Sequence, residues 1–147
     1  MKSWDVITAT VTAGTILLGA TAWAQGNDGV PGDRLVVPLP DISDLNDAQA
    51  KDLAHELAQA NVITSNCPEY DVSDGAWQLM TGTTDSLTAK LGLDPITYDR
   101  EYFRPAFSLM DDADACQTLG PDVQGTVDRL IAMGGDVEPA EQTPAAN

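Results

Sequence analysis

Apolar residues recur at helical spacing in several stretches of the chain, and each stretch predicts one amphipathic helix. The first stretch covers about residues 46–60 and the second about residues 74–91. A third begins at Asp94, and the last occupies about residues 121–134. This pattern predicts an all-α fold, a small bundle of four to five helices with one disulfide over residues 45–134.

The apolar stripe of each predicted helix identifies the expected core. Trp77 is the largest side chain in these stripes, and we expect it to anchor the core rather than bind a ligand. His55 falls opposite the stripe of the first helix, so it should be exposed. The expected core positions are Ala50, Leu53, Ala54, Leu57, Trp77, Met80, Thr84, Leu87, Leu91, Ala106, Leu109, Met110, Ala113, Cys116, Val123, Val127, Leu130 and Ile131.

Capping and helix-breaking residues mark the expected helix ends. Asp94 precedes a proline, which is typical of a helix start, and Gly120 precedes another proline where one helix stops and the next begins. Pro105 interrupts the third stretch. Either a kinked helix continues through Pro105 or a new helix starts there, and the sequence pattern is compatible with both. The other expected N-caps are Asp44 or Asn46, and Ser73 or Asp74.

The two ends of the chain lack the pattern of the helical region. Residues 1–24 contain a charge-free apolar run that ends in Ala-Trp-Ala, which is typical of a signal peptide cleaved after Ala24; an uncleaved membrane anchor is the alternative. Residues 25–44 are rich in Gly and Pro and predict an extended arm. Residues 135–147 predict a disordered acidic tail. We expect the arm to contact the domain through Leu35, Val37 and Leu39.

The chain has two cysteines, Cys67 and Cys116. An exported protein meets an oxidising compartment, where a pair of cysteines usually forms a disulfide. We therefore expect a Cys67–Cys116 bridge between the loop before the second helix and the end of the third. Two free buried thiols or an intermolecular bridge are the alternatives.

The chain has seven basic and 23 acidic residues, which gives a net charge of −16. Such a surface repels nucleic-acid phosphate and anionic lipid, so we expect no nucleic-acid partner and no membrane contact after signal cleavage. The acidic surface is typical of a soluble protein outside the cytoplasm, although it would also attract a basic partner or divalent cations.

No group of residues requires a particular chemistry. The one histidine, His55, has no serine in helical register with it, and no C-x-x-C motif occurs. We expect no cofactor, and the acidic runs at 71–75 and 111–114 miss the spacing of a calcium loop. The alternatives are an enzyme that uses acidic residues and a metal or haem carrier. Axial ligands for a haem would be His55 with Met80, Met110 or Met133.

One short segment concentrates aromatic and basic residues. Tyrosine and arginine are enriched at protein interfaces, so this segment predicts a contact surface for a protein partner in the cell envelope. The alternative is that its aromatic residues pack inward and its arginines pair with local acids. The residues of the predicted surface are Tyr98, Arg100, Tyr102, Arg104 and Phe107.

Together, the predicted signal peptide, Cys67-Pro68, the Trp77 helix and Cys116 before Leu119-Gly120-Pro121 resemble the small exported two-cysteine helical proteins of Gram-negative bacteria that are classed as domains of unknown function. The resemblance implies a periplasmic or secreted protein and brings no activity with it. We expect a non-catalytic binding or interaction module that acts through the residue 98–107 surface or a groove beside Trp77.

Overall fold

The computed structural model describes residues 36–139, and all regular secondary structure among them is helical. The all-α prediction with one disulfide is confirmed. The predicted signal peptide and the first part of the arm, residues 25–35, lie outside the described residues. The main helical stretches in this part of the chain are α1 (Asp47–Asn66), α2 (Asp74–Lys90), a composite helix that begins with α3 (Pro95–Tyr98), and α6 (Asp122–Ala132).

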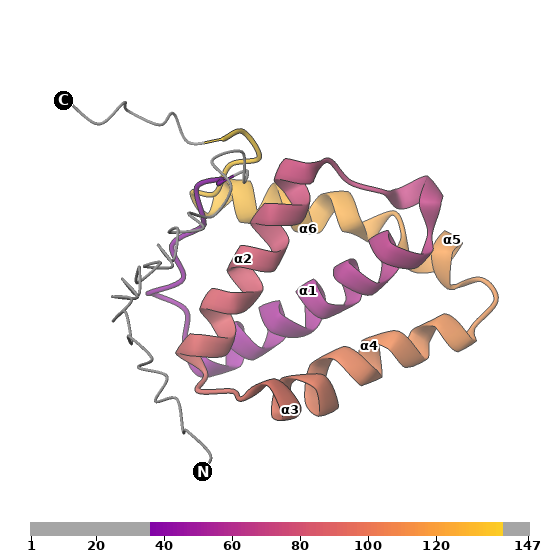
Figure 1. The fold of residues 1–147 in the computed structure, drawn as a ribbon, viewed down its shortest axis with the longest axis horizontal. Helices are drawn as coiled ribbons and strands as arrows, with labels where there is room; N and C mark the ends of the chain where they lie inside the picture. Colours follow the sequence, from indigo (N-terminus) through magenta and orange to yellow (C-terminus); the bar gives the residue numbers. More distant parts are fainter. Residues whose placement is uncertain (1–35, 140–147) are drawn as a thin grey trace, which may run out of the picture. The chain divides into compact units, whose positions relative to one another are not determined.

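Helix α1 is the central element of the domain, because it contacts α2, α6 and the composite helix. Figure 1 shows it between α4 and α6. Leu53 and Leu57 of α1 are fully buried, as the stripe predicted, and they pack with Leu79 of α2 and Leu130 of α6 in one core. Burial of side chains this large is the main stabilising contribution in a domain of this size.

A capping box begins α1. The side chain of Asn46 accepts a hydrogen bond from the backbone N–H of Gln49, and the Gln49 side chain accepts one from the backbone N–H of Asn46, both at 3.0 Å. The helix was expected to end near residue 60 but continues to Asn66. Val62 and Ile63 are buried in this additional part of the helix. Their β-branched side chains do not favour a helix by themselves, so packing against the core stabilises the helix here.

Helix α2 begins at the predicted cap, where the Ser73 side chain accepts a hydrogen bond from Ala76 N–H at 3.2 Å. Two positions of the predicted stripe, Met80 and Leu87, are fully buried, whereas Thr84 and Leu91 are only half-buried. Trp77 packs against the core as predicted, although it is itself only half-buried. Leu79, which the predicted stripe left out, is fully buried in the helix that packs on α1. The buried side chains of α2 are Ala76, Leu79, Met80, Thr83 and Leu87.

The third helical stretch continues through Pro105 as one composite helix. A π-helical turn precedes the proline, and within it the N–H of Arg104 donates to the carbonyl of Asp99, five residues earlier. Proline has no N–H to donate and its ring collides with the preceding turn of an α-helix, so the wider turn makes room for it. After α3 the composite helix consists of η2 (Asp99–Phe103), α4 (Arg104–Ser108) and η3 (Leu109–Asp111).

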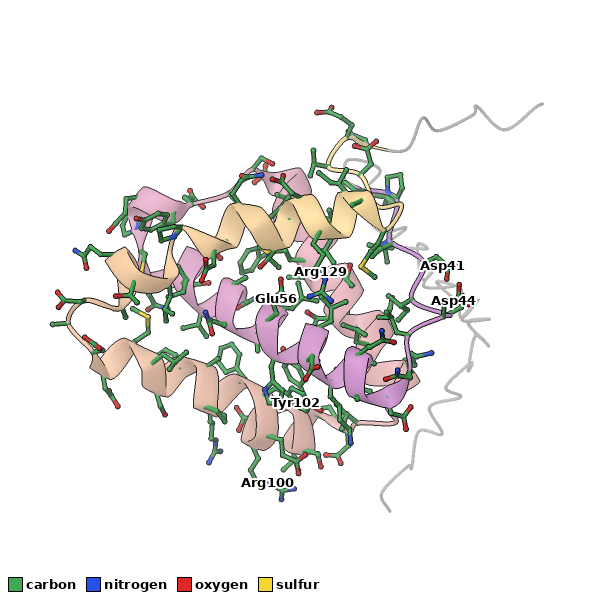
Figure 2. The ribbon with its side chains drawn as sticks, turned by 180° about the vertical axis from the view of Figure 1, so that it is seen from behind. Asp41, Asp44, Glu56, Arg100, Tyr102 and Arg129 are labelled. Atoms are coloured by element: carbon green, nitrogen blue, oxygen red, sulfur yellow. A yellow bond between two sulfur atoms is a disulfide. The ribbon has the colours of Figure 1, made fainter. Side chains whose placement is uncertain are left out.

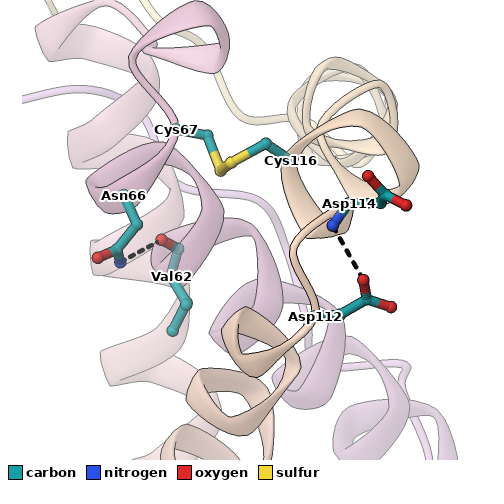
Figure 3. The surroundings of a disulfide bond; sticks show 6 residues. All are labelled: Val62, Asn66, Cys67, Asp112, Asp114 and Cys116. Atoms are coloured by element: carbon teal, nitrogen blue, oxygen red, sulfur yellow. Dashed lines mark hydrogen bonds between the residues drawn. A yellow bond between two sulfur atoms is a disulfide. The ribbon is translucent and has the colours of Figure 1, made fainter.

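The composite helix ends at Asp111, earlier than the predicted stripe required. Asp112 has an extended backbone conformation, and its carboxylate accepts a hydrogen bond from Asp114 N–H at 2.9 Å (Figure 3). Aspartate favours this local turn over continued helix. Ala113 is consequently exposed and not part of the core, and Cys116 lies on a separate short helix, α5 (Ala115–Leu119).

The predicted disulfide joins Cys67 and Cys116, whose Cα atoms are 5.6 Å apart (Figure 3). Cys67 follows the last residue of α1 and is fully buried, and the single 3₁₀ turn η1 (Pro68–Tyr70) leads from it towards α2. The bridge ties the end of α1 to α5 rather than to the end of the third helix. Residues on either side of the composite helix are thus held together across a sequence separation of 49.

The described part of the arm packs against the end of the domain. Val37 is buried, and Asp41 N–H donates to the Met133 carbonyl at 3.1 Å. In return, Asp136 N–H donates to the Pro38 carbonyl at 3.0 Å. Residue 75 must be glycine, because a Cβ there would overlap the carbonyl of Val137. Residues 135–137, expected to belong to the disordered tail, therefore pack on the domain, and residues 140–147 of that tail lie outside the described residues.

Candidate functional site

The residues of the predicted contact surface lie on the composite helix, but some of them belong to its inner face. Tyr102 is 3% exposed, so it contributes to the core and not to a surface, which corrects the prediction. Tyr98 is half-buried and also packs against the core. Tyr98, Tyr102 and Ala106 lie on the inner side of the composite helix at a repeat of four residues, the usual spacing of one helix face.

Burial changes the acid–base behaviour of these two tyrosines. Their rings are stacked with centroids 5.6 Å apart, beside α1. Burial raises the pKa of Tyr98, with a further contribution from the negative charge of Asp85. Burial likewise raises the pKa of Tyr102, and the charge of Glu101 adds to it. Both hydroxyls therefore remain neutral beyond the usual tyrosine range.

The outer face of the composite helix exposes apolar side chains. Ile96 is 76% exposed and Phe107 is 52% exposed. The ring of Phe107 stacks with that of half-buried Phe103, at a centroid distance of 6.4 Å. Large apolar residues that gather on one surface of a soluble protein are typical of protein contacts.

Two arginines lie on the same outer face. Arg104 Nε donates to the Asp99 carboxylate at 2.7 Å, and Arg100 donates to Glu101 at 3.0 Å. All four side chains are well exposed, so both ion pairs contribute little to stability. Figure 2 shows Arg100 pointing away from the body of the domain. We call Ile96, Arg100, Arg104 and Phe107 the contact face.

The segment that carries the contact face has as many basic as acidic residues. Between residues 95 and 110, the two acids Asp99 and Glu101 are matched by Arg100 and Arg104, so this segment has no net charge, whereas the whole chain carries −16. A neutral, partly apolar face on a strongly acidic protein lets another surface approach without strong electrostatic repulsion.

A separate groove lies between α1 and α6. Glu56 of α1 accepts hydrogen bonds from the Thr126 hydroxyl at 3.0 Å and from Arg129 of α6, and these contacts join the two helices (Figure 2). Beside them is an open hollow of about 440 Å³. Trp77, which was expected to border a groove, does not line this one.

The positions of the remaining candidate residues bear on the cofactor alternatives. His55 is exposed, as predicted, and Met80 is fully buried while Met110 and Met133 are half-buried. The ring of His55 lies against the ring of Tyr102, with centroids 4.3 Å apart and planes inclined by 33°. Among residues 36–139, no three His, Cys, Asp or Glu side chains converge on a common metal position.

In the part of the chain that the structure describes, no helix combines the length and apolarity needed to cross a bilayer. A comparison of the whole chain with known proteins found no matching family model, no matching curated protein and no matching solved structure.

Proposed function

We propose that the protein is a non-catalytic interaction module of the periplasm or the extracellular space, and that its contact face binds a protein partner of the cell envelope. The observation that carries this proposal is the exposure of Ile96 and Phe107 beside Arg100 and Arg104 on a face with no net charge. Aromatic residues and arginine supply most of the binding energy in protein interfaces. The Cys67–Cys116 disulfide is compatible with an oxidising compartment.

The chemistry of the face indicates the kind of partner. Phe107 and Ile96 require an apolar surface, and the arginines require carboxylates at its edge that replace Asp99 and Glu101. We therefore expect an apolar patch bordered by acidic residues on the partner. The proteins in the resemblance described above are exported as well, which agrees with a partner in the envelope.

Capture of partners from an envelope extract tests this proposal if it compares variants. The wild-type protein and a double variant, Arg104→Ala with Phe107→Ala, are immobilised side by side. Ile131→Ala is the matched control, because Ile131 is a similarly exposed apolar residue (41%) on α6. We expect a partner that binds the wild type and the control but not the double variant. Equal binding to all three would place the partner elsewhere and overturn the proposal.

A further inference from the structure

The contact face itself has the features that it requires of a partner. Ile96 and Phe107 form an exposed apolar surface, and the carboxylates of Asp99 and Glu101 lie on the same helix beside them. Among residues 36–139, three of the six exposed large apolar side chains belong to the composite helix: Ile96, Phe107 and Leu109. A second copy of the chain therefore offers an apolar patch with acidic residues at its edge.

The order of these residues along the composite helix is self-complementary. The midpoint of Ile96 and Phe107 along the chain lies between residues 101 and 102. Asp99 and Arg104 have the same midpoint. If two composite helices pack antiparallel about a two-fold axis at this midpoint, residues equally far from it lie level with each other in the two copies. One register thus aligns an apolar residue with an apolar residue and an acid with a base.

The ion pair within each copy leaves groups available for the second copy. Arg104 donates to Oδ2 of Asp99 through Nε, at 2.7 Å. The guanidinium has four further N–H donors on its terminal nitrogens, and the carboxylate has a second oxygen. The side chains of Arg104 and Asp99 are 74% and 43% exposed. Asp99 of one copy can therefore accept hydrogen bonds from the Arg104 side chains of both copies.

The place of the composite helix in the domain also suits a second copy. Its inner side packs on α1, and Figure 1 shows it at the edge of the domain, so its outer side is open among the described residues. Two copies with a charge of −16 each repel one another at long range. Physiological salt screens this repulsion beyond about 8 Å, and residues 95–110 add no net charge at the contact itself.

We infer that the partner of the contact face is a second copy of the chain, and that the two composite helices pack antiparallel about a two-fold axis. This inference rests on the proposed function, because it uses the same face. The contact extends over residues 96–107, about 17 Å of helix. An interface of one helix from each copy is small, so we expect a reversible dimer with a dissociation constant in the micromolar range or weaker.

Sedimentation equilibrium of the oxidised protein at physiological salt measures the association. The wild type should change from monomer to dimer as its concentration rises to about 1 mM. Phe107→Ala removes an apolar contact from both halves of the interface and should raise the dissociation constant at least about tenfold. Ile131→Ala, at an exposed apolar residue of α6, is the matched control and should dimerise like the wild type. A wild type that stays monomeric, or a Phe107→Ala variant that dimerises equally well, would overturn the inference.

Two charge reversals test the register. Asp99→Arg and Arg104→Asp each place like charges level with one another across the axis, so each variant alone should be monomeric. An equimolar mixture of the two variants has opposite charges at both positions and should form a heterodimer. Both changes lie at exposed side chains, so the melting temperatures should stay close to that of the wild type. If folded variants gain no mass on mixing, the antiparallel arrangement is wrong.

The capture experiment separates a failure of this inference from a failure of the proposed function. If the contact face captures a different envelope protein while the purified chain stays monomeric, the proposed function stands and the homodimer is wrong. If the purified chain dimerises, the chain itself should be captured from the extract by the wild type and by Ile131→Ala, but not by the double variant. A monomer that captures nothing would contradict both.

Discussion

The ring of His55 on α1 lies against the ring of Tyr102 in η2, with centroids 4.3 Å apart and planes inclined by 33°. The exposed histidine thereby covers a buried tyrosine at the place where α1 meets the composite helix. Aromatic pairs of this kind contribute roughly 1 kcal/mol beyond the burial of their surface. Tyr102 consequently holds the composite helix in place. It is not part of the contact face, but the position of that face depends on it.

Tyr102 is buried and Phe107 is exposed on the same composite helix, so substitutions at the two positions should change the free energy of unfolding by different amounts. Tyr102→Ala should lower the free energy of unfolding by about 3 kcal/mol, because it removes a buried aromatic side chain and leaves a cavity. Phe107→Ala, on the outer face of the same helix, should change it by about 0.5 kcal/mol or less. Urea unfolding followed by circular dichroism measures both. A loss of similar size in both variants would contradict the inward and outward assignment.

The raised pKa values of Tyr98 and Tyr102 predict a loss of stability in alkali. In the unfolded chain both tyrosines ionise near pH 10, whereas in the folded domain burial keeps them neutral to higher pH. Their contribution is therefore complete below about pH 10 and is lost as the pH rises from there through the folded-state pKa values. Unfolding midpoints in urea between neutral pH and about pH 11 should show this decline.

Tyr102→Phe is the control for the alkaline experiment. It keeps the aromatic ring and removes one of the two ionising hydroxyls, so its stability should fall less steeply with rising pH than that of the wild type. Parallel curves for the two proteins would show that other groups cause the decline.

The disulfide should contribute a large part of the stability. Linking residues 49 positions apart restricts the unfolded chain, which corresponds to about 4 kcal/mol in the chain-entropy description. The double variant Cys67→Ala with Cys116→Ala should therefore unfold at much lower urea concentration than the oxidised wild type. Addition of reductant should bring the wild type close to the variant and leave the variant unchanged. Equal midpoints with and without reductant would contradict the prediction.

Two glycines near the start of α6 should respond in opposite ways to alanine. Gly120 is buried, and a Cβ there would overlap the ring of Tyr70, so Gly120→Ala should destabilise the domain by about 1–3 kcal/mol. Gly125→Ala adds its methyl group in open space and should stabilise α6 by about 1 kcal/mol. Thermal unfolding of both variants measures the difference. Equal effects would contradict the roles assigned to the two glycines.

Local signals in the sequence predicted the helix starts. Asn46, Ser73 and Asp94 all cap helices, because a short polar side chain before an apolar stripe satisfies backbone donors without help from the rest of the fold. Gly120 was predicted from the same kind of signal, as a helix stop. Its backbone is right-handed, however, and the contact with Tyr70 is what requires a glycine there.

Features that depend on distant residues were not predicted. The extension of α1 to Asn66 requires the buried packing of Ile63, and the burial of Leu79 requires the contact of α2 with α1. The groove depends on Glu56 and Thr126, which are 70 residues apart.

Which side chains of the composite helix are exposed was only partly predicted, because composition finds aromatic and basic residues but not the direction in which they point. Arg100, Arg104 and Phe107 are exposed, whereas Tyr102 is buried. Tyr98, Tyr102 and Ala106 have the i, i+4 spacing of one helix face, but spacing alone did not decide whether this face or the one with the arginines is buried. The π turn before Pro105 was not predicted, because it depends on how the helix accommodates the proline.

The paired hydrogen bonds between residues 38–41 and 133–136 bring the beginning and the end of the described domain together. The linear order of the helices is therefore not essential to their packing. A circularly permuted gene, with a short peptide joining these two ends and new termini opened at exposed Gly92, would encode the same four-helix arrangement.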